Sequence, residues 1–318
     1  GATWSAFNNN MPITPITDMK IHRDDLVMST MGRGFWILDN IASIRHLEEA
    51  SKTSAFLFET KDAIRFRMNG RNSPQAGANL EYYIADKGQE VRLDILSNSG
   101  KVVRSFVSGK AQPAVNTEVD MGTGFSNPPA SGGLSNKAGL NKFNWNMRHH
   151  GVWSANPGRS YMGNGPMVST GEFKARLTVG DQVLERSFNV ALDPRATLVS
   201  DMDVKMQETL ALGLREFQGE VAKLVKAVGD ERKALENSLN QEKGSKKDQR
   251  RKEALDAVYY QLVTSPGTYM QPMLSAQTGY LNSMISRADQ QPGKDAYDRF
   301  EELKAKFLEI KKEFEALK

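Results

Sequence analysis

The sequence predicts a multidomain chain in which β-structure comes first and α-structure follows. Up to about residue 195, apolar side chains recur at every second position between Gly-, Asn- and Ser-rich turns, which is the pattern of β-strands. From Ser200 onward the apolar period lengthens to about three and a half residues, the pattern of packed helices. At 318 residues the chain also exceeds the length of about 250 to 300 residues at which one hydrophobic core stops growing. We therefore expect more than one domain.

Residues 1–50 carry the signals of two or three short strands. The segments "ITDMKIH" and "DLVMST" alternate apolar and polar side chains, and "GFWILDN" follows a Gly-Arg-Gly turn. So few strands are marginal in water by themselves. We expect residues 1–50 to pack against the rest of the chain through Phe35, Trp36 or Leu38, or to pair edge to edge with a second copy.

Residues 55–195 predict an antiparallel β-sandwich. Two hairpins are indicated, "VRLDILSNSGKVVRSFVSG" and "GEFKARLTVGDQVLERSFNVAL", each with a glycine in the turn that supplies positive φ. Between them, residues 111–139 are rich in Gly, Asn, Ser and Pro. We interpret residues 111–139 as a long mobile insertion in the sandwich.

Residues 200–318 predict an antiparallel helical bundle. Ser200 and Asp203 resemble a capping box that starts a long helix. Further helices are expected from about Lys247 to Val263, from about Pro272, and at the C-terminal end of the sequence. The apolar stripes of the first and last helices hold these residues: Leu210, Leu214, Phe217, Val221, Leu224 and Val228, then Phe300, Leu303, Phe307, Ile310, Phe314 and Leu317. We expect the bundle and the sandwich to have separate cores, joined near Pro194.

Composition excludes several classes of function. Cysteine is absent, which rules out disulfides and thiolate zinc sites. The net charge of +4 is spread evenly, without the basic stripe of a nucleic-acid binder. No run of 18 apolar residues predicts a membrane span. We expect no cofactor, no metal site, no nucleic-acid partner and no membrane insertion.

No catalytic residue is predicted. Glycoside cleavage needs two carboxyl groups facing each other across a cleft, whereas acids near strand ends more often bind backbone amides in turns; the acids in question are Asp18, Asp24, Asp25 and Asp39. His149 and His150 are adjacent, and neighbours on a strand point to opposite faces. We interpret both histidines as surface residues rather than as a metal site.

Aromatic residues supply the candidate ligand contacts. Trp36 and Trp145 lie in apolar alternation and are expected in the core. Trp153 is different, because the polar loop "SANPGRSYMGNG" follows it. Aromatic faces suit sugar rings, so we take Trp153, Arg159 and Tyr161 as the candidate ligand-binding residues.

Several motifs carry a resemblance to a known family. "NNNMPITPITDMKIHRDDLVMSTMGRGFWILDN", "GKVVRSF", "AGLNKFNWNMR" and "STGEFKARLTVGDQ" resemble the C-terminal part of bacterial proteins built from BNR-repeat, sortilin-like β-propellers, often labelled glycosyl hydrolases. The resemblance implies an incomplete propeller blade over residues 1–50, an immunoglobulin-like sandwich of the flagellar hook-cap type over residues 55–195, and a helical tail. The family usually has Asp after the tryptophan of the third motif, where this sequence has Asn146.

The resemblance implies a function for the module. Propeller glycosidases place their acid and base on earlier blades, so no catalytic residue is carried over to this sequence. We expect a noncatalytic structural and interaction module at the C-terminus of a secreted or periplasmic propeller protein. The alternative is an accessory or glycan-binding part of a propeller glycoside hydrolase. The implied partners are upstream propeller blades, carbohydrate or protein, and a second copy paired through the exposed blade edge.

Overall fold

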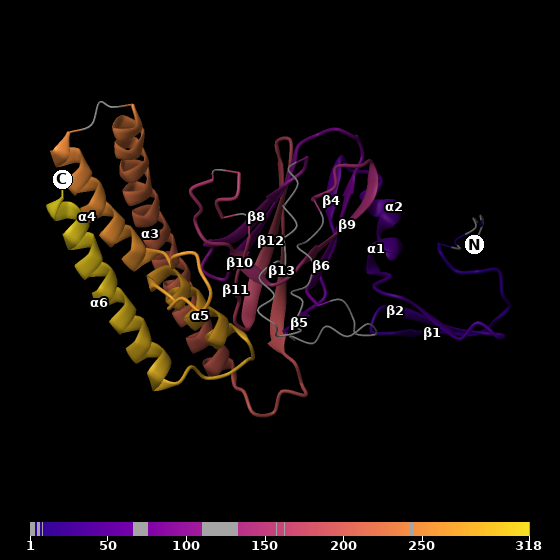
Figure 1. The fold of residues 1–318 in the computed structure, drawn as a ribbon. Helices are drawn as coiled ribbons and strands as arrows, with labels where there is room; N and C mark the ends of the chain where they lie inside the picture. The colour runs from indigo at the N-terminus through magenta and orange to yellow at the C-terminus, as the bar shows by residue number, and fades with distance from the viewer. Residues whose placement is uncertain are drawn as a thin grey trace.

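The computed structural model describes residues 4, 7, 9–65, 76–109, 133–156, 158–161, 163–241 and 245–317. Figure 1 shows two layers of strands in the middle, helices on one side and a small separate sheet at the opposite end. The predicted order of β-structure followed by α-structure is confirmed. None of the helices in these ranges is long and apolar enough to cross a membrane.

The small sheet consists of β1 (Ile16–His22), β2 (Asp25–Thr30) and β3 (Phe35–Leu38), in the order β1-β2-β3 and antiparallel throughout. Arg23 and Asp24 connect β1 to β2, and both have positive φ, at 50° and 63°. A two-residue turn with this backbone matches the twist of the flanking strands. Gly32 and Gly34 supply positive φ in the next turn.

A short connector attaches the small sheet to the sandwich. It contains α1 (Ala42–Arg45) and α2 (Leu47–Ala50), and it buries Ile41 and Ala50. Of the three residues predicted to pack against the sandwich, Phe35 is 79% exposed, whereas Trp36 and Leu38 are half-buried. Trp36 is half-buried and its indole N–H donates to the carbonyl of Arg33, so it is not the core residue that alternation predicted.

The sandwich has a five-stranded sheet in the order β5-β13-β12-β7-β8 and a three-stranded sheet in the order β4-β6-β9. All pairs are antiparallel except β5 with β13. The strands are β4 (Ala55–Leu57), β5 (Ala63–Arg65), β6 (Ala78–Ile84), β7 (Val91–Ser97), β8 (Val102–Val107), β9 (Gly139–Trp145), β12 (Gly171–Val179) and β13 (Gln182–Leu192).

One hydrophobic cluster fills the space between the two sheets. Trp145 is fully buried in it, as predicted, and packs against Phe173 and Phe188. Most of the predicted insertion, residues 110–132, lies outside the described residues. Its last part is fixed to the sandwich, because Leu134 is buried and the hydroxyl of Tyr82 donates to the carbonyl of Ser135.

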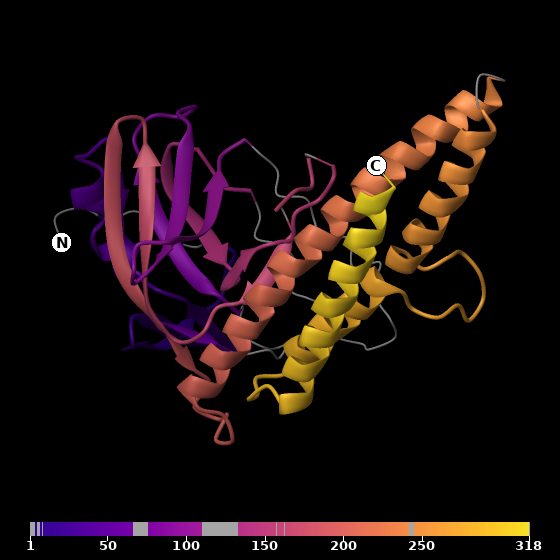
Figure 2. The same ribbon diagram turned by 90° about the vertical axis from the view of Figure 1, so that its left-hand side faces the viewer.

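A two-stranded ribbon leaves the sandwich and carries a long loop. The ribbon is formed by β10 (Arg148–His150) and β11 (Asn164–Met167), and the loop spans residues 151–163. Both strands lie beside the first long helix in Figure 1, and Figure 2 shows that helix running between the sandwich and the other helices.

The helical part contains α3 (Asp201–Asn240), α4 (Lys246–Leu262), α5 (Leu274–Ser286) and α6 (Lys294–Ala316). Ser200 and Asp203 form the predicted capping box, and Ser245 with Asp248 forms another at α4. The predicted stripes on α3 and α6 are buried in a second hydrophobic cluster. Burial of these stripes holds the helices together, since helix stability in proteins comes mostly from packing of an apolar face.

Candidate functional site

The helix α3 is fastened to the β-part of the molecule by a series of polar contacts along one face. Moving from its N-terminus, Asp201 accepts a hydrogen bond from Thr170 at 2.7 Å, and Gln207 accepts one from Arg65 at 2.9 Å. Further along are Glu208, which binds His149, and the residues Arg215, Gly219 and Lys223, which face the ribbon and its loop. The junction between the sandwich and the helices therefore brings together polar and charged side chains from both parts of the fold.

Arg65 is the central residue of the junction near the N-terminus of α3. Its side chain is 1% exposed, and its guanidinium donates to both carboxylate oxygens of Asp289, at 2.9 and 3.2 Å. It also donates to Gln207 and to the carbonyl of Val168. Gln207 in turn donates to the carbonyl of Ile285 at 2.6 Å. A buried charge is tolerated only with such partners, so Arg65 links three parts of the fold.

His149 and Glu208 form an ion pair in the middle of the junction. Their side chains are 12% and 16% exposed, so the prediction that His149 is a surface residue is wrong. Burial alone would raise the pKa of Glu208, but hydrogen bonds from His149 and Ser169 outweigh it and hold the pKa below its ordinary value. The pair therefore favours the ionised carboxylate at neutral pH.

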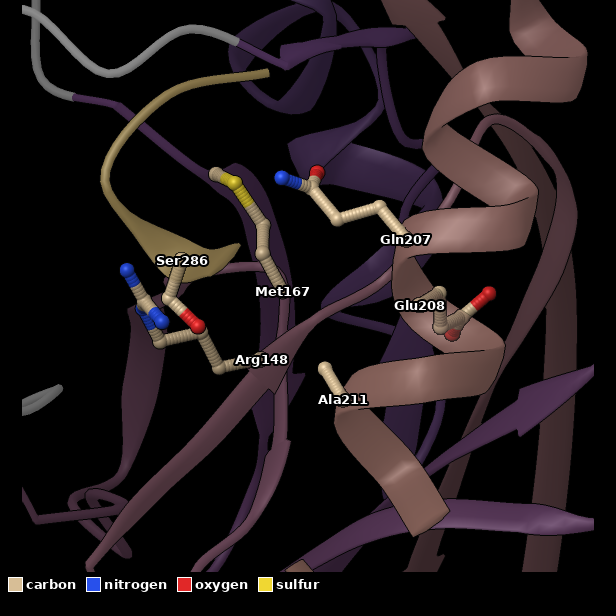
Figure 3. Close-up of a pocket in the computed structure, with 6 residues that line it drawn as sticks. All are labelled: Arg148, Met167, Gln207, Glu208, Ala211 and Ser286. Carbon is tan, nitrogen blue, oxygen red and sulfur yellow. The ribbon is translucent and has the colours of Figure 1, made fainter. Parts of the chain in front are cut away.

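A small pocket opens beside this ion pair (Figure 3). Gln207, Glu208 and Ala211 line it from α3, and Arg148, Met167 and Ser286 line the other side. Its volume is about 10 Å³, which is about the space of one water molecule and far too small for a sugar ring. The pocket belongs to the polar interior of the junction and is not a substrate cleft.

The predicted ligand residues lie in the loop of residues 151–163, which meets α3 further toward its C-terminus. Trp153 is half-buried against α3, where its Cβ approaches the position that a side chain on Gly219 would occupy. Lys223 lies over the Trp153 ring, 5.9 Å from its centroid. Tyr161 is 45% exposed, has φ of 59°, and meets the ring of His150 edge-on at 4.9 Å.

Arg159 is the third predicted ligand residue, and it is exposed. Its backbone N–H donates to the carbonyl of Asn156, while the N–H of Tyr161 donates to Val152. These bonds close the loop on itself, so Arg159 and Tyr161 share one structured loop. The structure brings the loop to α3 but does not test whether its residues bind a ligand.

Further charged residues on α3 lie near the loop and were not predicted. Arg215 is buried, donates to Glu216 at 2.5 Å and reaches the carbonyl of His150. Burial lowers the pKa of His150, and the charge of Arg215 lowers it further. The hydrogen bond that Lys223 donates to Glu220 raises the pKa of Lys223, and the nearby Tyr161 adds to this effect.

The acids that could have formed a catalytic pair are occupied in other ways. Asp18 accepts a hydrogen bond from the backbone of Met19, and Asp24 pairs with Arg45 at 2.6 Å. Burial would raise the pKa of Asp25, but its bonds to Lys61 and to the backbone of Asn40 lower it overall. Across the described ranges, no group of three His, Cys, Asp or Glu residues is placed to hold a metal ion.

Comparisons with known proteins give no family. No family model matches the sequence, and no curated protein matches it. Among solved structures, the chain is similar to the β-glucuronidase of Bifidobacterium dentium complexed with coumarin-3-O-glucuronide, with 12% identity and a TM-score of 0.19. The match covers 43% of this chain and 18% of that enzyme, so the chain spans less than a fifth of its length. A likeness at this TM-score carries no argument about fold or activity.

Proposed function

We propose that this chain is a noncatalytic structural and interaction module whose binding surface is the β1–β3 sheet. The observation that carries the proposal is the composition of one face of that sheet. The strand register places Thr30, at the end of β2, and six adjoining apolar side chains on this face; the apolar ones are Met19, Ile21, Leu26, Met28, Trp36 and Leu38. Met19 and Ile21 are 60% and 52% exposed. An exposed, contiguous apolar face marks an interaction site.

The way the sheet is attached supports the same proposal. Asn40 donates to the buried Glu81 of the sandwich at 3.2 Å, and Lys61 donates to Asp25 at 2.7 Å. The backbone N–H of Ile41 donates to the carbonyl of Asp24. These polar contacts hold the base of the sheet and leave its apolar face uncovered, so the sandwich presents the face rather than buries it.

The partner that we propose is a set of β-propeller blades from a longer parent protein. Blades of a propeller pack around a common axis through sheet faces, and a mostly apolar face of three strands suits that packing. This partner follows the resemblance of residues 1–50 to the last blade of BNR-repeat, sortilin-like proteins. The same resemblance supports an immunoglobulin-like sandwich and a secreted or periplasmic location.

The test is capture of the upstream propeller segment, produced as a separate polypeptide. The present chain should retain that segment, and Trp36→Asp or Met28→Asp should abolish retention because each places a charge in the apolar face. The matched control is Tyr269→Asp, since Tyr269 is fully exposed on the helical side. Equal retention by Trp36→Asp and Tyr269→Asp would contradict the proposal.

A second candidate function is glycan binding by the loop of residues 151–163, as part of a glycoside hydrolase. Exposed Tyr161 and Arg159, with Lys223 beside Trp153, provide an aromatic ring and two cations on one surface. Polysaccharide pull-down tests it. Tyr161→Ala should abolish retention, and it is a cleaner change than Trp153→Ala because Trp153 also packs on α3. Retention that survives Tyr161→Ala would remove this candidate.

A further inference from the structure

We propose that β1 pairs with β1 of a second copy of this chain, antiparallel and edge to edge, with the twofold axis at Met19. The proposal rests on the proposed function, since it takes the β1–β3 sheet as an interaction surface, and it names a second copy as the occupant of the sheet's edge. The two ideas concern different parts of the sheet. The proposed function uses the apolar face, and the pairing uses the outer edge of β1.

The outer edge of β1 is free in the part of the chain that the structure describes. There β1 pairs only with β2, and all seven residues of β1 are exposed. An edge strand of this length directs alternate N–H and C=O groups outward, where another strand can bind them. Figure 1 shows this sheet at the end of the molecule away from the helices, so a second copy can reach it.

Symmetry restricts the registers in which two β1 strands can pair. When the twofold axis is perpendicular to the sheet, residues directly opposite each other lie on the same face, so the axis must pass through a residue position. The ladder between β1 and β2 is irregular between Ile16 and Asp18 and regular from Asp18 to His22. The candidate centres in the middle of the strand are therefore Asp18, Met19 and Lys20.

The charges on β1 select one of these three registers. Centring on Asp18 opposes two aspartates, and centring on Lys20 opposes two lysines; like charges directly opposite destabilise a sheet. Centring on Met19 places Asp18 of each copy opposite Lys20 of the other, which forms two symmetric ion pairs. Within the described residues, neither Asp18 nor Lys20 has an ion-pair partner. Asp18 accepts a hydrogen bond from the backbone N–H of Met19 at 2.8 Å, and pairing at Met19 would exchange this local contact for bonds to the second copy.

The same register also extends the apolar face. Met19 lies on the face that carries Met28 and Trp36, whereas Asp18 and Lys20 lie on the other face. Pairing at Met19 therefore brings two methionines together on the apolar side and two ion pairs on the mixed side. A single six-stranded sheet with one continuous apolar face results. The alternation of Asp18, Met19 and Lys20 is self-complementary, which favours a second copy over an unrelated strand.

A single introduced cysteine tests the register, because the chain has no cysteine of its own. Met19→Cys should give a covalent dimer on oxidation, since residues directly opposite in an antiparallel pair lie within disulfide range. Ile21→Cys is the matched control on the same strand and the same face. In the proposed register the two copies of residue 21 are roughly 13 Å apart along the strands, so this variant should not cross-link.

Charge reversal tests the same register without an introduced cysteine. Analytical ultracentrifugation should show a dimer that Asp18→Lys or Lys20→Asp weakens by at least about tenfold, because each change opposes like charges twice. The double variant Asp18→Lys/Lys20→Asp should restore the dimer. Both positions are exposed, and circular dichroism checks that the variants fold.

Three results would overturn the pairing: a monomer at every concentration, equal cross-linking of the two cysteine variants, or a dimer indifferent to charge reversal. A monomer that still captures the propeller segment through its apolar face would remove the pairing and leave the proposed function intact. A charge-sensitive dimer that fails to capture the segment would support the pairing and contradict the proposed function.

Discussion

Nε2 of His149, on the ribbon, lies 2.6 Å from Oε1 of Glu208, on the first long helix, and this ion pair spans the junction of the β-part and the helical part. The contact therefore makes the attachment of the helices sensitive to acid in a predictable way.

Acid should weaken the junction through Glu208. Its pKa is held below the ordinary value of 4.5, so the carboxylate contributes stability that is present above about pH 4.5 and is lost as pH falls through the lowered pKa. Thermal melting should therefore show a steep loss of stability in that window. Glu208→Gln should lose about 1 to 3 kcal/mol at neutral pH and flatten the slope. Glu185→Gln, which weakens an exposed pair with Arg176, is the control; it should cost no more than about 0.2 to 1 kcal/mol and leave the slope unchanged.

A second loss of stability should come from His150 at higher pH. Burial lowers its pKa below the ordinary 6.5, so the folded chain holds the neutral ring while the unfolded chain takes up a proton. Stability should decline from about pH 6.5 downward and level off once pH passes the lowered pKa. Melting of His150→Gln should lack this step. A step of the same size in the variant would show that another group is responsible.

Removing the buried cation should be the most damaging single change. Arg65→Ala removes the hydrogen bonds that its guanidinium donates to Asp289 and Gln207, so we expect a loss of about 3 to 5 kcal/mol in the free energy of unfolding. Denaturant unfolding measures it. Arg176→Ala removes an exposed pair of the same chemistry and should cost about 0.2 to 1 kcal/mol. Similar costs for the two variants would contradict the role given to Arg65.

The two hydrophobic clusters predict that the sandwich folds without the helices. Residues 55–195, expressed alone, should keep strand-type circular dichroism, because their cluster draws no residue from the helices. Arg65 would lose Asp289 and Gln207 in that fragment, so it should be less stable than the same part of the whole chain. Collapse to random coil in both the wild-type fragment and an Arg65→Met version would argue against independent cores.

Helices were the part of the fold most accessible from sequence. Leu210, Leu214 and Phe217 are buried because helical periodicity is local and a stripe of this length has to face something. Ser200 and Asp203 are only three residues apart, so the capping box could also be predicted directly. The alternation in residues 16–38 likewise predicted strands correctly.

Alternation does not tell whether a strand's apolar face is covered. Trp36 and Trp145 have the same local pattern, yet Trp145 is fully buried between two sheets and Trp36 is half-exposed on a sheet with no second layer. The contacts between the sandwich and the helices could not be predicted from the sequence either. Arg65 and Asp289 are 224 residues apart, and no local pattern connects them or places Gly219 under Trp153.

Amide hydrogen exchange of the chain with and without the upstream propeller segment tests the central claim most directly. The account predicts that the segment slows exchange in residues 16–38 and leaves the loop of residues 151–163 and α3 unchanged. Slower exchange in that loop or in α3, with no change in residues 16–38, would contradict the claim that the β1–β3 sheet is the interaction surface.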